Sequence, residues 1–161
     1  MRRIDGFIGG KSVKVTSGRE ADVFNPNTGD VQAKVGLAST GDVDLAVQAA
    51  AKALPGWSST NPQRRARVMF EFKRLVEANM QSLAELLSSE HGKVIADSKG
   101  DIQRGLEVIE FACGIPHALK GEYTEGAGPE IDVYSMRQPL GVVAVISPFN
   151  FPAMIPMWMF G

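Results

Sequence analysis

The last 22 residues, Leu140–Gly161, contain no charged side chain, and this run constrains the fold more than any other feature of the sequence. It is long enough to cross a bilayer as a helix. Three prolines recur in it every four residues, however, and each removes an amide donor that hydrocarbon would leave uncompensated. They are Pro148, Pro152 and Pro156. Asn150 adds a polar amide among them, so a membrane-spanning helix is a poor explanation. We predict instead a short buried strand over Val142–Ile146, followed by a structured loop and the start of a helix.

Charge and cysteine content narrow the classes of function. The 161 residues include 17 Lys and Arg against 18 Asp and Glu, so a net charge of −1 does not favour nucleic acid over a small molecule. The one cysteine, Cys113, cannot form an internal disulfide or a multi-cysteine metal site, and no metal is predicted. The sequence opens Met-Arg-Arg-Ile-Asp without an apolar signal core, which fits a reducing cytoplasm.

Turn-forming residues separate short apolar runs over the first 35 residues, which predicts a β-meander. The turn formers are Gly9-Gly10, Ser17-Gly18 and Asn25–Gly29. Apolar residues then recur at helical spacing as far as Leu54. They predict an amphipathic helix that begins near Thr40 and ends at Pro55-Gly56.

Asn61 and Pro62 mark the start of a second helical region, since asparagine caps helices and proline lacks only an amide hydrogen that is not needed there. The apolar stripe that follows predicts one long helix, or two helices joined near Asn79. A further stripe resumes after Gly92 and is closed by Pro116. Its members are Ile102, Leu106, Ile109 and Cys113. Three or four helices are therefore expected in the middle of the chain.

A half-exposed hairpin is predicted between Gly121 and Gln138, where glycines and a proline precede alternating apolar and polar residues. The apolar strand over Val142–Ile146 comes next. A parallel strand buried on both faces needs neighbours in its sheet, and the sequence supplies no further strand and helix units. The pattern thus indicates an unfinished α/β fold.

Several stretches resemble one family, in the expected order along the chain. GVVAVISPFNFP resembles the strand and loop that open the nicotinamide-binding domain of aldehyde dehydrogenases, and PFNFP with Pro-x-Trp-Met-Phe is similar to the methylmalonate-semialdehyde group. The others are FIGGK, VFNPNTGDVQAKV, GWSSTNPQRRARVMFEFKRLVE and SSEHGKVIADSKGDIQRGLEVIEFA. The resemblance implies the N-terminal part of that fold. Residues 1–120 would begin the NAD-binding domain, 121–139 would be an oligomerisation hairpin, and 140–161 the first strand and loop of an incomplete Rossmann-like core.

The resemblance also implies an activity: oxidation of methylmalonate or malonate semialdehyde by NAD, with loss of CO2 and acyl transfer to coenzyme A. A hydrolytic semialdehyde dehydrogenase is the alternative within the family, and a non-catalytic interaction module is the alternative outside it. The apolar tail Met154–Phe160 argues against a self-contained module. The family's cysteine nucleophile and general-base glutamate would lie beyond Gly161. The chain alone is therefore expected to be inactive, and the intact protein to be a homodimer or homotetramer.

Three site residues are implied by the resemblance of the strand end and the PFNFP motif. In the family, the motif asparagine, here Asn150, donates its side-chain amide to the charge that develops on the attacked oxygen. A loop asparagine bonded to its own backbone is the structural alternative. Ser147 and Phe149 are implied to line the dinucleotide site, although no GxGxxG fingerprint is present. Core packing is the alternative for Phe149 and Phe151.

Arg104 is expected to bind the substrate carboxylate. It lies about 200° around the helix from Ile102, away from the apolar stripe, and Gly105 beside it leaves room for close approach. A guanidinium can hold a carboxylate through two parallel hydrogen bonds, and the D-x-x-R-G context resembles the semialdehyde group. A surface ion pair with Asp101 or Glu107 is the alternative.

Cys113 falls on the apolar stripe, so it is expected to be a small buried hydrophobe with a protonated thiol and not the nucleophile. His91 and His117 lack a local partner pattern. Both are interpreted as ordinary residues of helix ends or loops.

Overall fold

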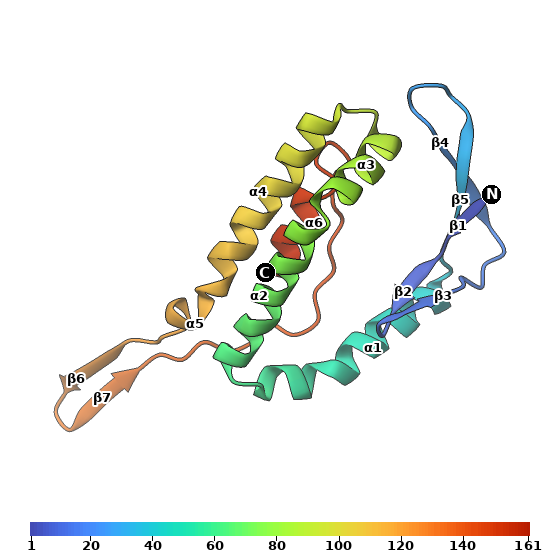
Figure 1. Ribbon diagram of the computed structural model, residues 1–161. Coiled ribbons are helices and arrows are strands. Elements are labelled where there is room, and N and C mark those ends of the chain that lie inside the picture. The colour runs from blue at the N-terminus through green and yellow to red at the C-terminus, as the bar shows by residue number, and fades with distance from the viewer.

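The computed structural model describes residues 1–161, which form three regions, and the chain returns from the third to the second at its C-terminal end (Figure 1). Short strands make up the N-terminal region, helices make up the middle, and a hairpin projects away from the helices. One helix joins the strands to the helical cluster, so the molecule is extended. Only 16 of the 161 residues are buried, and most of these lie in the helical cluster, which therefore holds the core.

A three-stranded sheet and a separate two-stranded ladder form the N-terminal region. The strands are β1 (Arg2–Ile4), β2 (Gly6–Ile8), β3 (Lys11–Val13), β4 (Glu20–Phe24) and β5 (Val31–Gly36). Sequence neighbours pair as predicted in β2–β3 and β4–β5, which turns connect. The meander prediction is wrong for β1, which lies parallel to β5. Since only Asp5 separates β1 from β2, β1 cannot fold back on its neighbour.

Helix α1 (Thr40–Ser59) begins with a reciprocal pair of capping hydrogen bonds. Ser39 Oγ accepts from the Asp42 amide, and the Asp42 carboxylate accepts from the Ser39 amide at 2.7 Å. The same carboxylate accepts from the amide of Thr16 at 3.1 Å and from its hydroxyl at 2.9 Å. Asp42 therefore ties the start of α1 to the strand region.

The end of α1 differs from the prediction, because the helix continues through Pro55 and Gly56 as far as Ser59. Hydroxyl groups complete its last turn. Ser58 Oγ donates to the carbonyl of Pro55 at 3.2 Å, and Thr60 Oγ1 donates to that of Gly56 at 2.7 Å. These bonds satisfy carbonyls that a helix end otherwise leaves unpaired.

Four further helices form the helical cluster beyond α1. They are α2 (Pro62–Ala78), α3 (Met80–His91), α4 (Ile95–Cys113) and the short α5 (Ile115–Ala118). Asn61 caps α2 as predicted, with its side chain accepting from the amide of Gln63 at 2.9 Å. The apolar stripe is divided into two helices at Asn79. Gly92 ends α3 in the left-handed conformation, with φ at 88°.

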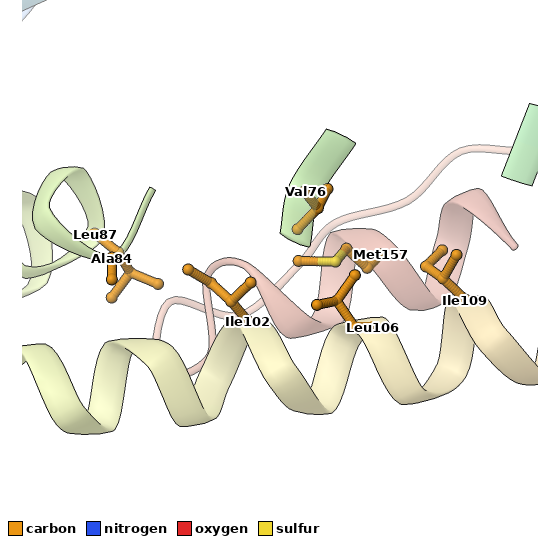
Figure 2. Close-up of a cluster of buried hydrophobic side chains, with 7 residues drawn as sticks. All are labelled: Val76, Ala84, Leu87, Ile102, Leu106, Ile109 and Met157. Atoms are coloured by element: carbon orange, nitrogen blue, oxygen red, sulfur yellow. The ribbon is translucent and has the colours of Figure 1, made fainter. Parts of the chain in front are cut away.

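One face of α4 carries the core (Figure 2). Ile102, Leu106 and Ile109 project from it and are at most 1% exposed, which confirms the stripe predicted from their spacing. The other members of the cluster come from α2, α3 and α6: they are Val76, Ala84, Leu87 and Met157. The space at Gly105 is filled from within the chain, since a Cβ there would lie 2.7 Å from Met157 Sδ. The sequence had suggested that this space is open to a ligand, and that expectation is wrong.

Helix α6 (Met154–Phe160) confirms the helix start predicted after the proline-rich loop. Met157 is buried against α4, whereas Trp158 and Phe160 are about half exposed, so the chain covers the apolar tail only in part. None of the helices combines the length and the apolar character needed to cross a membrane.

The prediction of a buried strand over Val142–Ile146 is wrong for this chain. The segment has no strand assignment, and Ile146 is 98% exposed. Its composition suits the centre of a parallel sheet, but no other strand pairs with it. Without such neighbours, its backbone has no ladder of hydrogen bonds to hold it in a strand.

Strands β6 (Tyr123–Gly128) and β7 (Ile131–Tyr134) form the predicted antiparallel hairpin. Tyr123 Oη donates to the Asp132 carboxylate at 2.6 Å, which links the two strands. The hairpin is more exposed than predicted, since every residue of β7 is exposed. It extends away from the helices (Figure 1), so the rest of the chain does not cover its apolar side chains.

Candidate functional site

A surface cavity lies where the end of α3, the first half of α4 and the loop before α6 meet. Arg104 of α4 and Asn150 of the loop both line it, although they are far apart in the sequence. Phe151, Met154 and Trp158 supply apolar lining. The fold thus brings together two of the four predicted site residues. It offers a small molecule a cation, an amide donor and an apolar wall.

Arg104 lies on the exposed side of α4 and forms no ion pair. Neither pair of the alternative interpretation is present, because Asp101 pairs with Lys93 and Glu107 has no cationic partner. The guanidinium keeps its donors free. Two of them can bind the two oxygens of a carboxylate in parallel.

The side-chain amide of Asn150 has no hydrogen-bond partner within the chain, so it does not bond its own backbone. Only the backbone carbonyl of Asn150 is engaged, and it accepts from Lys93 Nζ at 3.1 Å. A neutral amide with free donors can stabilise a negatively charged oxygen without titrating itself.

A buried carboxylate, that of Asp101, also lines the cavity. Asp101 is 2% exposed, and its Oδ1 accepts from the amide of Met154, the first residue of α6, at 2.8 Å. Its Oδ2 lies 3.4 Å from Lys93 Nζ. Lys93 Nζ also lies 5.1 Å from the centroid of the Phe151 ring, a cation–π distance. Asp101 and Lys93 thus connect α4 to both ends of the segment from Asn150 to Met154.

This connection was not predicted from the sequence, in which Asp101 was considered only as a partner of Arg104. The sequence did indicate that Asp101 has a buried partner. Asp101 shares its helical stripe with Ser98, Ile102 and Gly105, all of which are buried. An acidic side chain on such a stripe requires a partner, because burying an unpaired charge is costly. The identity of the partner was not visible, since Lys93 lies before α4 and not at helical spacing within it.

The structure does not bring Ser147 and Phe149 to the cavity of Arg104 and Asn150. Ser147 is exposed, and Phe149 is 63% exposed, with its ring centroid 5.3 Å from that of His91. Phe151 is 41% exposed, so neither phenylalanine packs in the core. His91 ends α3 as interpreted, and its Nδ1 is buried without a hydrogen-bond partner.

Cys113 lies at the C-terminal end of α4 and is 8% exposed, as predicted from the stripe. Burial raises the pKa of its thiol, and the neighbouring charge of Lys73 opposes this only partly. The thiol is therefore protonated at neutral pH and poorly suited to nucleophilic attack. No group of three or more His, Cys, Asp and Glu side chains is placed to hold a metal ion.

Comparison with known proteins shows the family of the chain. The model of the aldehyde dehydrogenase family matches residues 13–161. A malonate-semialdehyde dehydrogenase from Pseudomonas aeruginosa is 48% identical over 160 residues, which is 99% of this chain and 32% of the relative. The chain thus spans about a third of the length of such curated relatives.

Two solved structures are similar over nearly the whole chain. One, from Sinorhizobium meliloti and described as a methylmalonate-semialdehyde dehydrogenase with NAD, has a TM-score of 0.96 and 60% identity. The methylmalonate-semialdehyde dehydrogenase of Oceanimonas doudoroffii has a TM-score of 0.95 and 47% identity. Each match covers 98% of this chain and 32% of the other. The mixed α/β arrangement is therefore that of the N-terminal part of these proteins, which confirms the predicted fold class.

Proposed function

The chain belongs to the aldehyde dehydrogenase family, and from that premise we propose that it supplies the substrate-anchoring part of an NAD-dependent semialdehyde dehydrogenase. The observation that carries the proposal is the shared cavity of Arg104 and Asn150. In malonate and methylmalonate semialdehyde, a carboxylate and an aldehyde are bonded to the same carbon. A cation and an amide donor that line one cavity suit those two groups.

Each residue has a distinct task in this proposal. Arg104, free of ion pairs, holds the carboxylate and orients the aldehyde. Asn150, whose side-chain amide is free, donates to the aldehyde oxygen as negative charge develops there during attack. Phe151, Met154 and Trp158 exclude water from one side of the cavity and so strengthen both interactions.

The dinucleotide is assigned to the exposed segment next to the cavity. Ser147 offers an exposed hydroxyl and Phe149 an exposed ring, and both fit contact with NAD, which accepts hydride when bound. Coenzyme A is the proposed acyl acceptor, because the relatives include enzymes named as acylating. The products are propionyl-CoA or acetyl-CoA, and the substrate carboxylate leaves as CO2. Hydrolysis of the acyl intermediate is the alternative outcome.

We further propose that the 161-residue chain does not oxidise aldehydes by itself. Its one cysteine, Cys113, is buried with a raised pKa and does not line the cavity. The active form would be a homodimer or homotetramer of a longer protein in the reducing cytoplasm. The exposed apolar residues of the β6–β7 hairpin support its role in association.

The test compares the 161-residue chain with a hybrid that joins it to the remaining two thirds of the Oceanimonas doudoroffii enzyme. NADH formation from malonate semialdehyde is measured with and without coenzyme A, and products are identified by mass spectrometry. We expect no NADH from the chain, and acyl-CoA from the hybrid. NADH from the homogeneous 161-residue chain would overturn the inactivity proposal.

Arg104→Met in the hybrid tests the anchor. We expect kcat/KM for malonate semialdehyde to fall about 10- to 100-fold, the value of a charged hydrogen-bonded pair. The value for propionaldehyde, which lacks the carboxylate, should change little. Lys99→Met, which removes an exposed charge from the same helix, is the matched control. Equal losses for both aldehydes would exclude carboxylate binding by Arg104.

A further inference from the structure

The loop that carries Asn150 has few anchors of its own. Residues 142–150 are all exposed, and no strand pairs with them. An amide that stabilises developing charge must nevertheless be held within a narrow range of positions, because such donors act through preorganisation. Something outside the loop has to fix it.

Two side chains near α4 make that connection. Lys93 Nζ donates to the carbonyl of Asn150 at 3.1 Å, and the Asp101 carboxylate accepts from the amide of Met154 at 2.8 Å. Lys93 and Asp101 are joined at 3.4 Å, and their side chains are 13% and 0% exposed. The pair therefore holds the segment at both ends from a buried, rigid base.

We propose that Lys93 and Asp101 are positioning residues, which hold the backbone from Asn150 to Met154 against α4 and so fix where the Asn150 amide lies in the cavity. Lys93 sets the peptide that follows Asn150. Asp101 sets the start of α6, and its charge keeps Lys93 in place. The inference rests on the proposed role of Asn150, but the anchoring itself can be measured without catalysis.

Amide hydrogen exchange in the full 161-residue chain tests the anchoring. In Asp101→Ala the Met154 amide loses its acceptor, and we expect its exchange to accelerate about tenfold or more. Asp101→Asn keeps an oxygen at the same position, so it should restore most of the protection. In Lys93→Met the amide of Ile155, which donates to the carbonyl of Phe151 at 3.3 Å, should exchange faster, while that of Met154 stays protected.

Glu107→Ala and Lys99→Met are the matched controls, since both residues are exposed on α4 and neither forms an ion pair. Neither control should change exchange at Met154 or Ile155. The circular dichroism of all variants shows whether α4 remains folded. Unchanged Met154 exchange in a folded Asp101→Ala chain would overturn the proposal. If the alanine variant does not fold, Lys93→Met decides, because unchanged Ile155 exchange in that variant would overturn the proposal.

The kinetic test separates positioning from general stability. In the hybrid enzyme, Asn150→Ala should lower kcat about 10²- to 10³-fold, and Asp101→Ala about tenfold or more, with the KM for NAD within about twofold. In an Asn150→Ala background, Asp101→Ala should cost almost nothing further, because the group it positions is absent. An equal additional loss in both backgrounds would overturn the proposal.

The two levels of inference can fail separately. If Asn150→Ala leaves kcat unchanged in an active hybrid, the role of Asn150 in the proposed function is wrong, whatever the exchange data show. If Asn150→Ala lowers kcat but Asp101→Ala changes neither kcat nor exchange, only the positioning role is wrong.

Discussion

Gly105 packs directly against Met157, with no room for a side chain between them. A Cβ on Gly105 would lie 2.7 Å from Met157 Sδ and 3.2 Å from Met157 Cβ. This contact lets α6 lie directly on α4. The thioether end of methionine is flexible, but its Cβ moves only with the helix backbone.

Gly105→Ala should therefore shift α6 and destabilise the chain by about 1–3 kcal/mol, the usual cost of overpacking a core. This exceeds the gain of at most about 1 kcal/mol from better helix propensity. Urea unfolding followed by circular dichroism measures the change. Gly100→Ala is the control, because that glycine of α4 has open space around it and should gain stability. Equal effects of both substitutions would contradict the contact.

Acid should selectively weaken the start of α1. Hydrogen bonds from the Ser39 amide and hydroxyl, and then from Thr16, lower the pKa of Asp42 from 3.8 to about 2. Above about pH 5 the carboxylate is charged in both the folded and the unfolded chain, so its stabilisation is complete. Between about pH 5 and pH 2 the unfolded chain takes up the proton first, and the stabilisation is lost.

Asp42→Asn should consequently lower the melting temperature at pH 6, and the difference from the unsubstituted chain should shrink as the pH falls to 2. Thermal unfolding by circular dichroism across this range measures it. Asp44→Asn, an exposed aspartate of the same helix turn, serves as the control. A difference that stays constant with pH would show that the Asp42 charge is not the cause.

Cys113 should react slowly with thiol reagents while the chain is folded, because burial both hinders access and raises the pKa of the thiol. We expect the rate with a disulfide reagent at pH 8 to be on the order of 10²-fold below that of free cysteine, and to approach it in urea. Absorbance of the released thiol gives the rate. A fast native reaction would mean that the end of α4 opens readily.

Gly121→Ala should open the base of the hairpin, since a Cβ at this position would overlap the backbone carbonyl oxygen of Ser135. The Ser135 amide donates to the Glu122 carbonyl at 2.9 Å, and its hydrogen exchange should accelerate about tenfold as this pairing weakens. Gly128→Ala, where an added Cβ meets only ordinary contacts, should leave Ser135 protected. Unchanged exchange in Gly121→Ala would show that the hairpin base adapts.

Local patterns predicted most of the helical region correctly, because they reflect contacts made within one helix or across its buried face. The cap at Asn61 and the stripe through Ile102, Leu106 and Ile109 are of this kind. The helix end at Pro55 was predicted too early. Proline removes one backbone hydrogen bond, but hydroxyl groups after it completed the turn, and no simple rule for proline includes them.

Non-local features were less predictable. Val142–Ile146 has the composition of a central strand, yet a strand also requires a neighbour, and composition says nothing about whether one is present. Helical geometry correctly placed Arg104 away from the core, but the cavity that it shares with Asn150 could not be predicted from local spacing. The buried pair of Lys93 and Asp101 depends on how the turn at Gly92 directs the chain, which the spacing of residues does not reveal.

The docking of α6 on α4 also determines an order of events on the ribosome. Met157 covers the face of α4, but it is synthesised 44 residues after Cys113, the last residue of that helix. At roughly 5–20 residues per second, α4 is complete for about 2–9 s before its cover is made. During that interval a nascent-chain chaperone has access to the same apolar face that α6 later occupies.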